Sequence, residues 1–225
     1  MSGAKRPPRD YGPVQLAQAL GLAAFQVERG LSGGLIPPAD LNGPRWSAAV
    51  VESIRSRSDK IIAAAGTLPD LGAWRAAEFL SGRFGVTVDP DIMTELDRVG
   101  VVPMVGYYKE SPLYDGVALE AFTNRTTLDR AMTVGRLLTA DQSAAYLKIR
   151  RADLDHLVHA RWLEPVKRVR SGWQRRRDYP AVALYRAGDL DVLVAHPAID
   201  WEEIRATPSG RTSALARLTA PTRST

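Results

Sequence analysis

One order of features occurs three times along the 225-residue chain. Alanine and leucine three residues apart come first, an apolar pair close to a proline follows, and an aromatic residue with apolar residues five and eight positions later comes last. The Ala/Leu pairs are Ala17 and Leu20, Ala77 and Leu80, and Ala144 and Leu147. The apolar pairs are Leu35-Ile36 before Pro37, Val101-Val102 before Pro103, and Trp162-Leu163 before Pro165. The aromatic sets are Trp46, Val51 and Ile54, then Tyr114, Leu119 and Phe122, then Tyr185, Leu190 and Leu193. Chance accounts for one such match, but three in the same order indicate an internal repeat.

The pattern predicts a small helical unit in each segment. Two short helices cannot bury their apolar faces alone, so they need a hairpin and a third helix to complete a core. Alanine lets two helix backbones approach closely, and the proline ends the second helix and begins an extended segment. The aromatic residue then closes the hairpin on the core. We therefore expect a mainly α-helical fold with short β-hairpins.

The first segment resembles a known group of domains. The runs 16–22, 34–37 and 43–46, which read LAQALGL, GLIP and GPRW, are similar to the DNA-binding domain of the MerR and excisionase-like winged-helix families. Residues 144–185 look like a divergent copy with a longer wing, and residues 76–122 match least, with an insertion around 81–84. The resemblance implies tandem winged helix-turn-helix domains, each with a β-hairpin wing. No long heptad helix or cysteine follows, so a metal or thiol effector is not implied.

The predicted boundaries separate three repeats by two linkers. They are a disordered basic tail (1–13), repeat 1 (14–57), a linker (58–71), a degenerate acidic repeat 2 (72–122), a linker helix (123–137), a basic repeat 3 (138–197) and a partly disordered C-terminal tail (198–225). The first linker holds a helix-favouring run that ends at Gly66, a plausible C-cap. The tails are rich in Pro, Ser, Thr, Gly and Arg, a composition typical of disorder.

Charge differs strongly between the repeats. Residues 14–57 hold four Lys/Arg and three Asp/Glu, a net charge of +1. Residues 67–122 hold four against nine, or −5, and residues 138–197 hold eleven against seven, or +4. The second helix of repeat 2, with Asp89, Asp91, Glu95 and Asp97, would be repelled by phosphates. Repeat 2 is therefore interpreted as a spacer or a protein-binding module, with exposed Tyr107 and Tyr108 as partner-binding candidates. The alternative is that these tyrosines line the core of the wing.

Repeat 3 is predicted to carry the main DNA contact. Thr139 and Gln142 fit a capping box at a helix start, Lys148 and Ile149 would form the turn, and the second helix would begin at Arg150. An acid-free stretch between Glu164 and Asp178, centred on a Ser171-Gly172 turn, reads as a hairpin with a basic tip. The DNA-binding candidates of this repeat are Arg150, Arg151, His156, Lys167, Arg168, Arg170, Arg175, Arg176 and Arg177. The competing interpretation of the basic stretch is a solvated loop.

Repeat 1 offers three further DNA-binding candidates. Its second helix, expected over about 23–32, would expose Gln26 and Arg29. The resemblance places Arg45 at the wing arginine that meets the DNA backbone. The alternative is a structural domain in which Arg45 pairs with an acid.

The remaining patterns favour a binding protein over an enzyme. No phosphate-cradling loop, Ser/His/Asp set or calcium loop can be defended, and we expect no cofactor and no metal. No apolar run reaches the ~18 residues of a membrane span, and the N-terminus has no apolar signal region, so we expect a cytoplasmic, nucleoid-associated protein. The predicted function is sequence-specific binding of double-stranded DNA, as a transcriptional regulator. The alternatives are an excision or segregation accessory protein of a mobile element or plasmid, and a protein-interaction adaptor.

Overall fold

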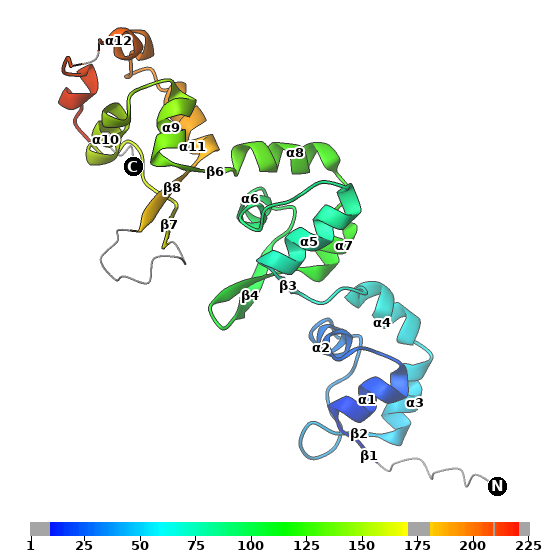
Figure 1. The fold of residues 1–225 in the computed structure, drawn as a ribbon. Helices are drawn as coiled ribbons and strands as arrows, with labels where there is room; N and C mark the ends of the chain where they lie inside the picture. The colour runs from blue at the N-terminus through cyan, green and yellow to red at the C-terminus, as the bar shows by residue number, and fades with distance from the viewer. Residues whose placement is uncertain (1–9, 171–180, 209, 221–225) are drawn as a thin grey trace. The chain divides into compact units, whose positions relative to one another are not determined.

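The computed structural model describes residues 10–170, 181–208 and 210–220. The fold is mainly helical, with small antiparallel sheets between the helices (Figure 1). The chain divides into two compact units. Unit 1 comprises Met1–Arg83 and Val99–Thr123, and unit 2 comprises Phe84–Arg98 and Asn124–Thr225, so the elements of repeat 2 are shared between both.

A similar order of elements occurs three times in the described chain, but the hairpin expected in each repeat forms only in the second and third, because the first has just an isolated bridge between Leu41 and Arg45 at that point. The first series is β1 (Asp10–Tyr11), α1 (Pro13–Leu20), α2 (Ala24–Ser32), β2 (Trp46–Ser47), α3 (Ala48–Arg55) and α4 (Ser58–Ala65). The second is β3 (Leu71–Gly72), α5 (Ala73–Phe84), α6 (Ile92–Arg98), β4 (Met104–Tyr108), β5 (Ser111–Tyr114), α7 (Gly116–Ala121) and α8 (Arg125–Val134). The third is β6 (Leu137–Thr139), α9 (Ala140–Leu147), α10 (Arg151–His159), β7 (Lys167–Val169), β8 (Val182–Arg186) and α11 (Ala187–Val194), followed by α12 (Trp201–Ala206) and the 3₁₀ helix η1 (Ala214–Arg217).

Burial follows the repeated sequence features. The three Ala/Leu pairs, the second member of each apolar pair and the three aromatic sets are all at most 8% exposed. In the first repeat Trp46 packs in the core, and its indole Nε1 donates to the carbonyl oxygen of Pro37 at 2.9 Å. The proline signal and the aromatic signal of one repeat are therefore joined by a hydrogen bond.

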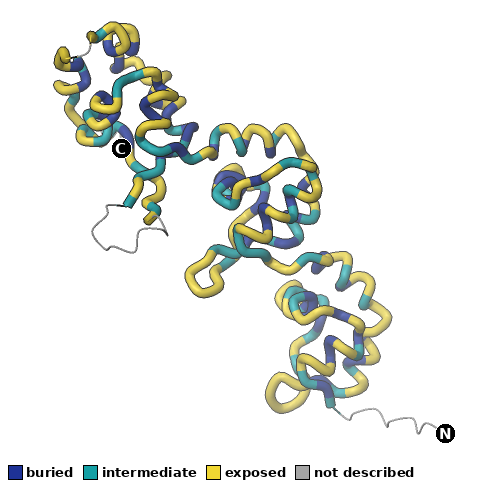
Figure 2. The backbone as a smooth tube through the Cα atoms, in the orientation of Figure 1, coloured by how far each residue is buried: buried dark blue, intermediate teal, exposed yellow. Residues whose placement is uncertain are grey.

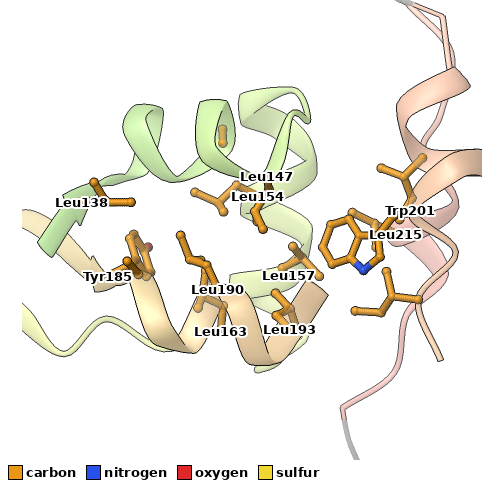
Figure 3. Close-up of a cluster of buried hydrophobic side chains, with 14 residues drawn as sticks. Leu138, Leu147, Leu154, Leu157, Leu163, Tyr185, Leu190, Leu193, Trp201 and Leu215 are labelled. Atoms are coloured by element: carbon orange, nitrogen blue, oxygen red, sulfur yellow. The ribbon is translucent and has the colours of Figure 1, made fainter. Parts of the chain in front are cut away.

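The core of the third repeat contains residues from beyond the predicted domain. Leu147, Leu157, Tyr185 and other side chains from α9, α10, β8 and α11 form one cluster. Figure 3 shows that Trp201 and Leu215, from the C-terminal segment, lie at the end of this cluster near Leu157 and Leu193. Disorder was expected in part of the tail over 198–225, from about residue 207, and this is wrong for η1, whose Leu215 is buried; the ordered α12 precedes that point.

The N-terminal boundary also needs correction. Residues 10–11 were expected in a disordered tail, but Asp10 and Tyr11 pair with Ser47 and Trp46 in an antiparallel ladder. Tyr11 is buried in the core of the first repeat. The short strand thus closes the same core as the aromatic residue opposite it, while residues 1–9 lie outside the described chain.

Several local predictions are confirmed. Thr139 N donates to Gln142 Oε1 at 2.9 Å and Gln142 N to Thr139 Oγ1 at 3.3 Å, which completes the capping box of α9. Lys148 ends α9 in the left-handed conformation at φ 58°, as expected of the turn. Gly66 caps α4 at φ 73°. The insertion expected around 81–84 lengthens α5 to 12 residues, against 8 in α1 and in α9.

Candidate nucleic-acid interface

The hairpin β7–β8 of repeat 3 has two distinct faces. Lys167 lies opposite Leu184, Arg168 opposite Ala183 and Val169 opposite Val182. Successive side chains of a strand point to opposite faces, so Arg168 shares a face with Ala183 and the buried Tyr185. Ala183 packs against the repeat 3 core. Arg168 therefore extends the face that bears the core of repeat 3, and Lys167 lies on the reverse face.

Arg168 and Arg170 are the free cations of this hairpin. Both are exposed, and neither has an ion-pair partner within the described residues. Arg168 lies in β7 and Arg170 directly follows the last residue of that strand, Val169. The predicted contacts Arg175, Arg176 and Arg177 lie in 171–180, outside the described residues.

Arg150 is engaged inside the protein, contrary to the prediction that it faces the major groove. It is the N-cap residue of α10, and its Nε and Nη2 donate to Asp153 Oδ2 and Oδ1, each at 2.9 Å. Its Nη1 donates to the carbonyl oxygens of Pro208 and Arg211 at 3.1 and 3.0 Å. The guanidinium thus fastens the C-terminal segment to the start of α10, and we withdraw Arg150 from the interface.

Asp153 is the buried partner in this arrangement. Burial opposes its ionisation, but hydrogen bonds from Arg150 and Ser213 outweigh that effect and hold the pKa of Asp153 below its ordinary value. The hydrogen bond to Asp153 also raises the pKa of Arg150. Asp153, near the start of α10, therefore stabilises the fold through these hydrogen bonds.

The outer face of α10 carries little net positive charge. Arg151 is exposed and pairs with Asp141, at 3.2 Å, and with Asp155. Exposed pairs of this kind are worth at most about 1 kcal/mol, so Arg151 can exchange a carboxylate for a phosphate. His156 is partly buried and His159 is exposed. Arg151 and His156 remain predicted contacts, without a surplus of cations around them.

The predicted contacts of repeat 1 on α2 are also used internally. Gln26 was expected to be exposed, but it is buried, and its Nε2 donates to the carbonyl oxygen of Gly66 at 2.7 Å. Arg29 donates to the carbonyl oxygens of Ala65 and Leu68 and pairs with Asp70. Both side chains join α2 to the segment that follows α4, so they are withdrawn from the interface.

Arg45 pairs with an acid, as the alternative interpretation of this residue expected. Its Nη2 pairs with Asp10 Oδ1 at 3.0 Å, and both side chains are close to half exposed. The pair joins the start of β1 to the loop before β2. Arg45 is accessible, but its charge is balanced by Asp10.

The acidic helix α6 packs within unit 2, where it meets basic residues of repeat 3. Arg186 Nε donates to Glu95 Oε2 and Arg186 Nη2 to Glu95 Oε1, both at 2.8 Å, and the two side chains are 13% and 7% exposed. The hydrogen bond to Glu95 raises the pKa of Arg186. Lys167 Nζ pairs with Asp91 Oδ1 at 2.6 Å. The reverse face of the hairpin therefore lies against α6.

A cavity of about 420 Å³ lies beside these pairs. Its walls come from α6, the start of β6, the hairpin and the start of α11. Both ion pairs, Lys167–Asp91 and Arg186–Glu95, line it.

Arg29 and Glu95 occupy matching positions in repeats 1 and 2. Each lies six residues after the residue whose carbonyl oxygen starts the second helix, Ala23 and Asp89 respectively. Arg29 pairs with Asp70 near β3, and Glu95 pairs with Arg186 in β8. In both repeats this helix holds an element of the next repeat. These pairings were not predicted from the sequence, although the opposite net charges of residues 67–122 (−5) and 138–197 (+4) favoured them.

Tyr107 and Tyr108 lie on the β4–β5 hairpin in unit 1 and are 65% and 64% exposed. Figure 2 draws this hairpin largely in the colour of exposed residues. The alternative that these tyrosines line the core of the wing is therefore wrong.

Comparison of the chain with family models, with curated proteins and with solved structures gave no match. In the described part of the chain, no cluster of three or more His, Asp or Glu side chains is placed to hold a metal ion. No helix among the described residues has the length and apolar character needed to cross a bilayer.

Proposed function

We propose that this protein binds double-stranded DNA through repeat 3, with the β7–β8 hairpin as the main contact. The observation that carries the proposal is the pair of exposed arginines, Arg168 in β7 and Arg170 directly after it, on a hairpin that follows two short helices. A hairpin beside a helix-turn-helix is the arrangement of a winged helix, whose wing follows the DNA backbone. In the sequence, the acid-free stretch between Glu164 and Asp178 holds further arginines, of which Arg175, Arg176 and Arg177 lie outside the described residues.

In this proposal, contacts to the DNA backbone contribute more to the affinity than contacts to base edges do. Arg150 is engaged by Asp153, and Arg151 is balanced by Asp141 and Asp155, so α10 offers few free donors for base edges. Contacts to phosphate position a protein but carry no sequence information directly. Discrimination between duplex sequences is therefore expected to be modest, and Arg151 and His156 are the residues on which it would depend. A role in transcription stays a prediction.

Binding to a fluorescent duplex, measured by anisotropy, tests the proposal. Each phosphate contact gives a salt exponent of about 0.9, so two contacts at ~0.1 M salt are worth roughly 60-fold in affinity relative to 1 M. We expect the parent to bind, and the double variant Arg168→Gln/Arg170→Gln to bind up to that factor more weakly. Arg55→Gln/Lys60→Gln, which removes the same charge from exposed sites in unit 1, is the matched control. Equal losses in both variants, or no binding by the parent, would contradict the proposal.

A second candidate function, protein docking at the β4–β5 hairpin, is favoured by the exposure of Val105, Tyr107 and Tyr108. These three large apolar side chains lie within four residues of one strand, β4, and exposed apolar surface of this kind marks interaction sites when it forms a patch. The test is a partner that copurifies with the parent, is lost with Tyr107→Ser/Tyr108→Ser and is kept with Trp74→Ser. Trp74 is 73% exposed on α5, so it controls for the loss of an exposed aromatic side chain.

A further inference from the structure

Two ion pairs join α6 to the hairpin of repeat 3, and they differ in burial. Arg186 and Glu95 form a bidentate pair that is almost buried, and Arg186 also bonds Asp189 at 2.7 Å. Lys167 and Asp91 form a single contact in which the side chains are 45% and 36% exposed. A buried pair is costly to break, whereas an exposed pair exchanges its partner readily. The first pair therefore holds α6 in place, and the second can open without loss of the fold.

The exposed pair occupies a cation of the proposed DNA contact. Lys167 lies in β7 next to Arg168 and points to the reverse face, where Asp91 precedes α6. The Lys167 side chain is 45% exposed, so a phosphate can reach its ammonium group beside Asp91. A phosphate that binds Lys167 must replace Asp91 or share the ammonium group with it, so the two anions compete for one cation.

We propose that Asp91 is a built-in competitor of DNA phosphate that lowers the affinity of the β7–β8 hairpin for a duplex by occupying Lys167. The inference rests on the proposed function and deepens it, because it names an internal regulator of the same site. It accounts for the position of the acidic α6 segment beside the basic hairpin within unit 2. The buried Glu95–Arg186 pair holds α6 beside the hairpin and so keeps Asp91 close to Lys167.

The competition predicts a specific pattern of variant effects. In the parent, Lys167→Gln weakens duplex binding less than it does in the Asp91→Asn background, since Asp91 competes with phosphate for Lys167. Asp91→Asn frees Lys167 for one more phosphate, which at ~0.1 M salt raises affinity by up to about eightfold and steepens the salt exponent by about 0.9. Adding Lys167→Gln to Asp91→Asn removes the gain. Glu28→Gln on the exposed side of α2 changes the net charge equally and is the control.

Anisotropy titrations of these variants with one duplex, at several salt concentrations, test the inference. A gain with Asp91→Asn that disappears with Lys167→Gln supports it, including the case in which the parent itself binds too weakly to measure. No gain, a gain that survives Lys167→Gln, or an equal gain with Glu28→Gln overturns it. Loss of binding by Arg168→Gln/Arg170→Gln is scored separately, so failure of the competitor and failure of the DNA contact are distinguishable.

Discussion

Replacing Arg186 with alanine is expected to destabilise unit 2 strongly. Glu95 is 7% exposed and receives two 2.8 Å hydrogen bonds from Arg186, so the substitution leaves a buried carboxylate without its main partner. Removing one partner of a buried pair costs about 3–5 kcal/mol. Arg98 approaches Glu95 Oε2 at 3.7 Å and offsets part of the loss. We therefore expect about 3 kcal/mol, at the lower end of that range.

Urea unfolding followed by circular dichroism measures this cost. Because the chain has two units, the transition that belongs to unit 2 must be resolved before a free energy is assigned. Arg55→Ala, which breaks an exposed 3.6 Å pair with Glu52, is the control and should cost less than about 1 kcal/mol. Replacing Glu95 and Arg186 together with leucine should recover most of the loss, because the charges left without these partners, Asp189 and Arg98, are accessible to solvent. A cost for Arg186→Ala that equals the control would refute this account of the buried pair.

Two further predictions concern the C-terminal segment. Leu215→Ala should lower the free energy of unfolding by about 2–5 kcal/mol, because Leu215 is buried in the repeat 3 core. The control Val192→Ala, at a 70% exposed position, should change the free energy little. Equal small effects of both variants in urea unfolding would show that the segment around Leu215 is not part of the core. The stability that Asp153 contributes over Asp153→Asn should be fully present above the ordinary carboxyl pKa of 3.8 and fade as pH falls through the lowered folded pKa; a parent-variant difference that stays constant from pH 6 to pH 2 would contradict this.

The repeated apolar features were sufficient to predict where the cores lie. Apolar residues at fixed spacing define which side of each helix is buried, and Trp46, Tyr114 and Tyr185 are each at most 4% exposed, as the pattern requires. Turn chemistry was equally informative, since the capping box at Thr139 and the glycine at 66 act locally. Such signals are short-range, so they do not depend on knowing how distant segments meet.

The uses of individual charges could not be predicted in the same way. Arg29 and Arg150 were expected to be available to DNA, but each bonds carbonyl groups that lie further along the chain. The local sequence around a charged residue does not indicate which distant group it will bond. The C-terminal segment, rich in Pro, Ser and Arg, likewise gave no indication that Trp201 and Leu215 are buried. Charge totals per segment held the missing information, because opposite totals in adjacent repeats favour pairing between them as well as separate roles.

The dependence of duplex affinity on salt tests the central claim most directly. For the parent, a plot of the logarithm of the association constant against the logarithm of the salt concentration should have a negative slope. The double variant Arg168→Gln/Arg170→Gln should reduce the magnitude of that slope by about 1.8. Parent and variant slopes that coincide would mean that the β7–β8 hairpin does not contact phosphate, and the proposed interface would have to be abandoned.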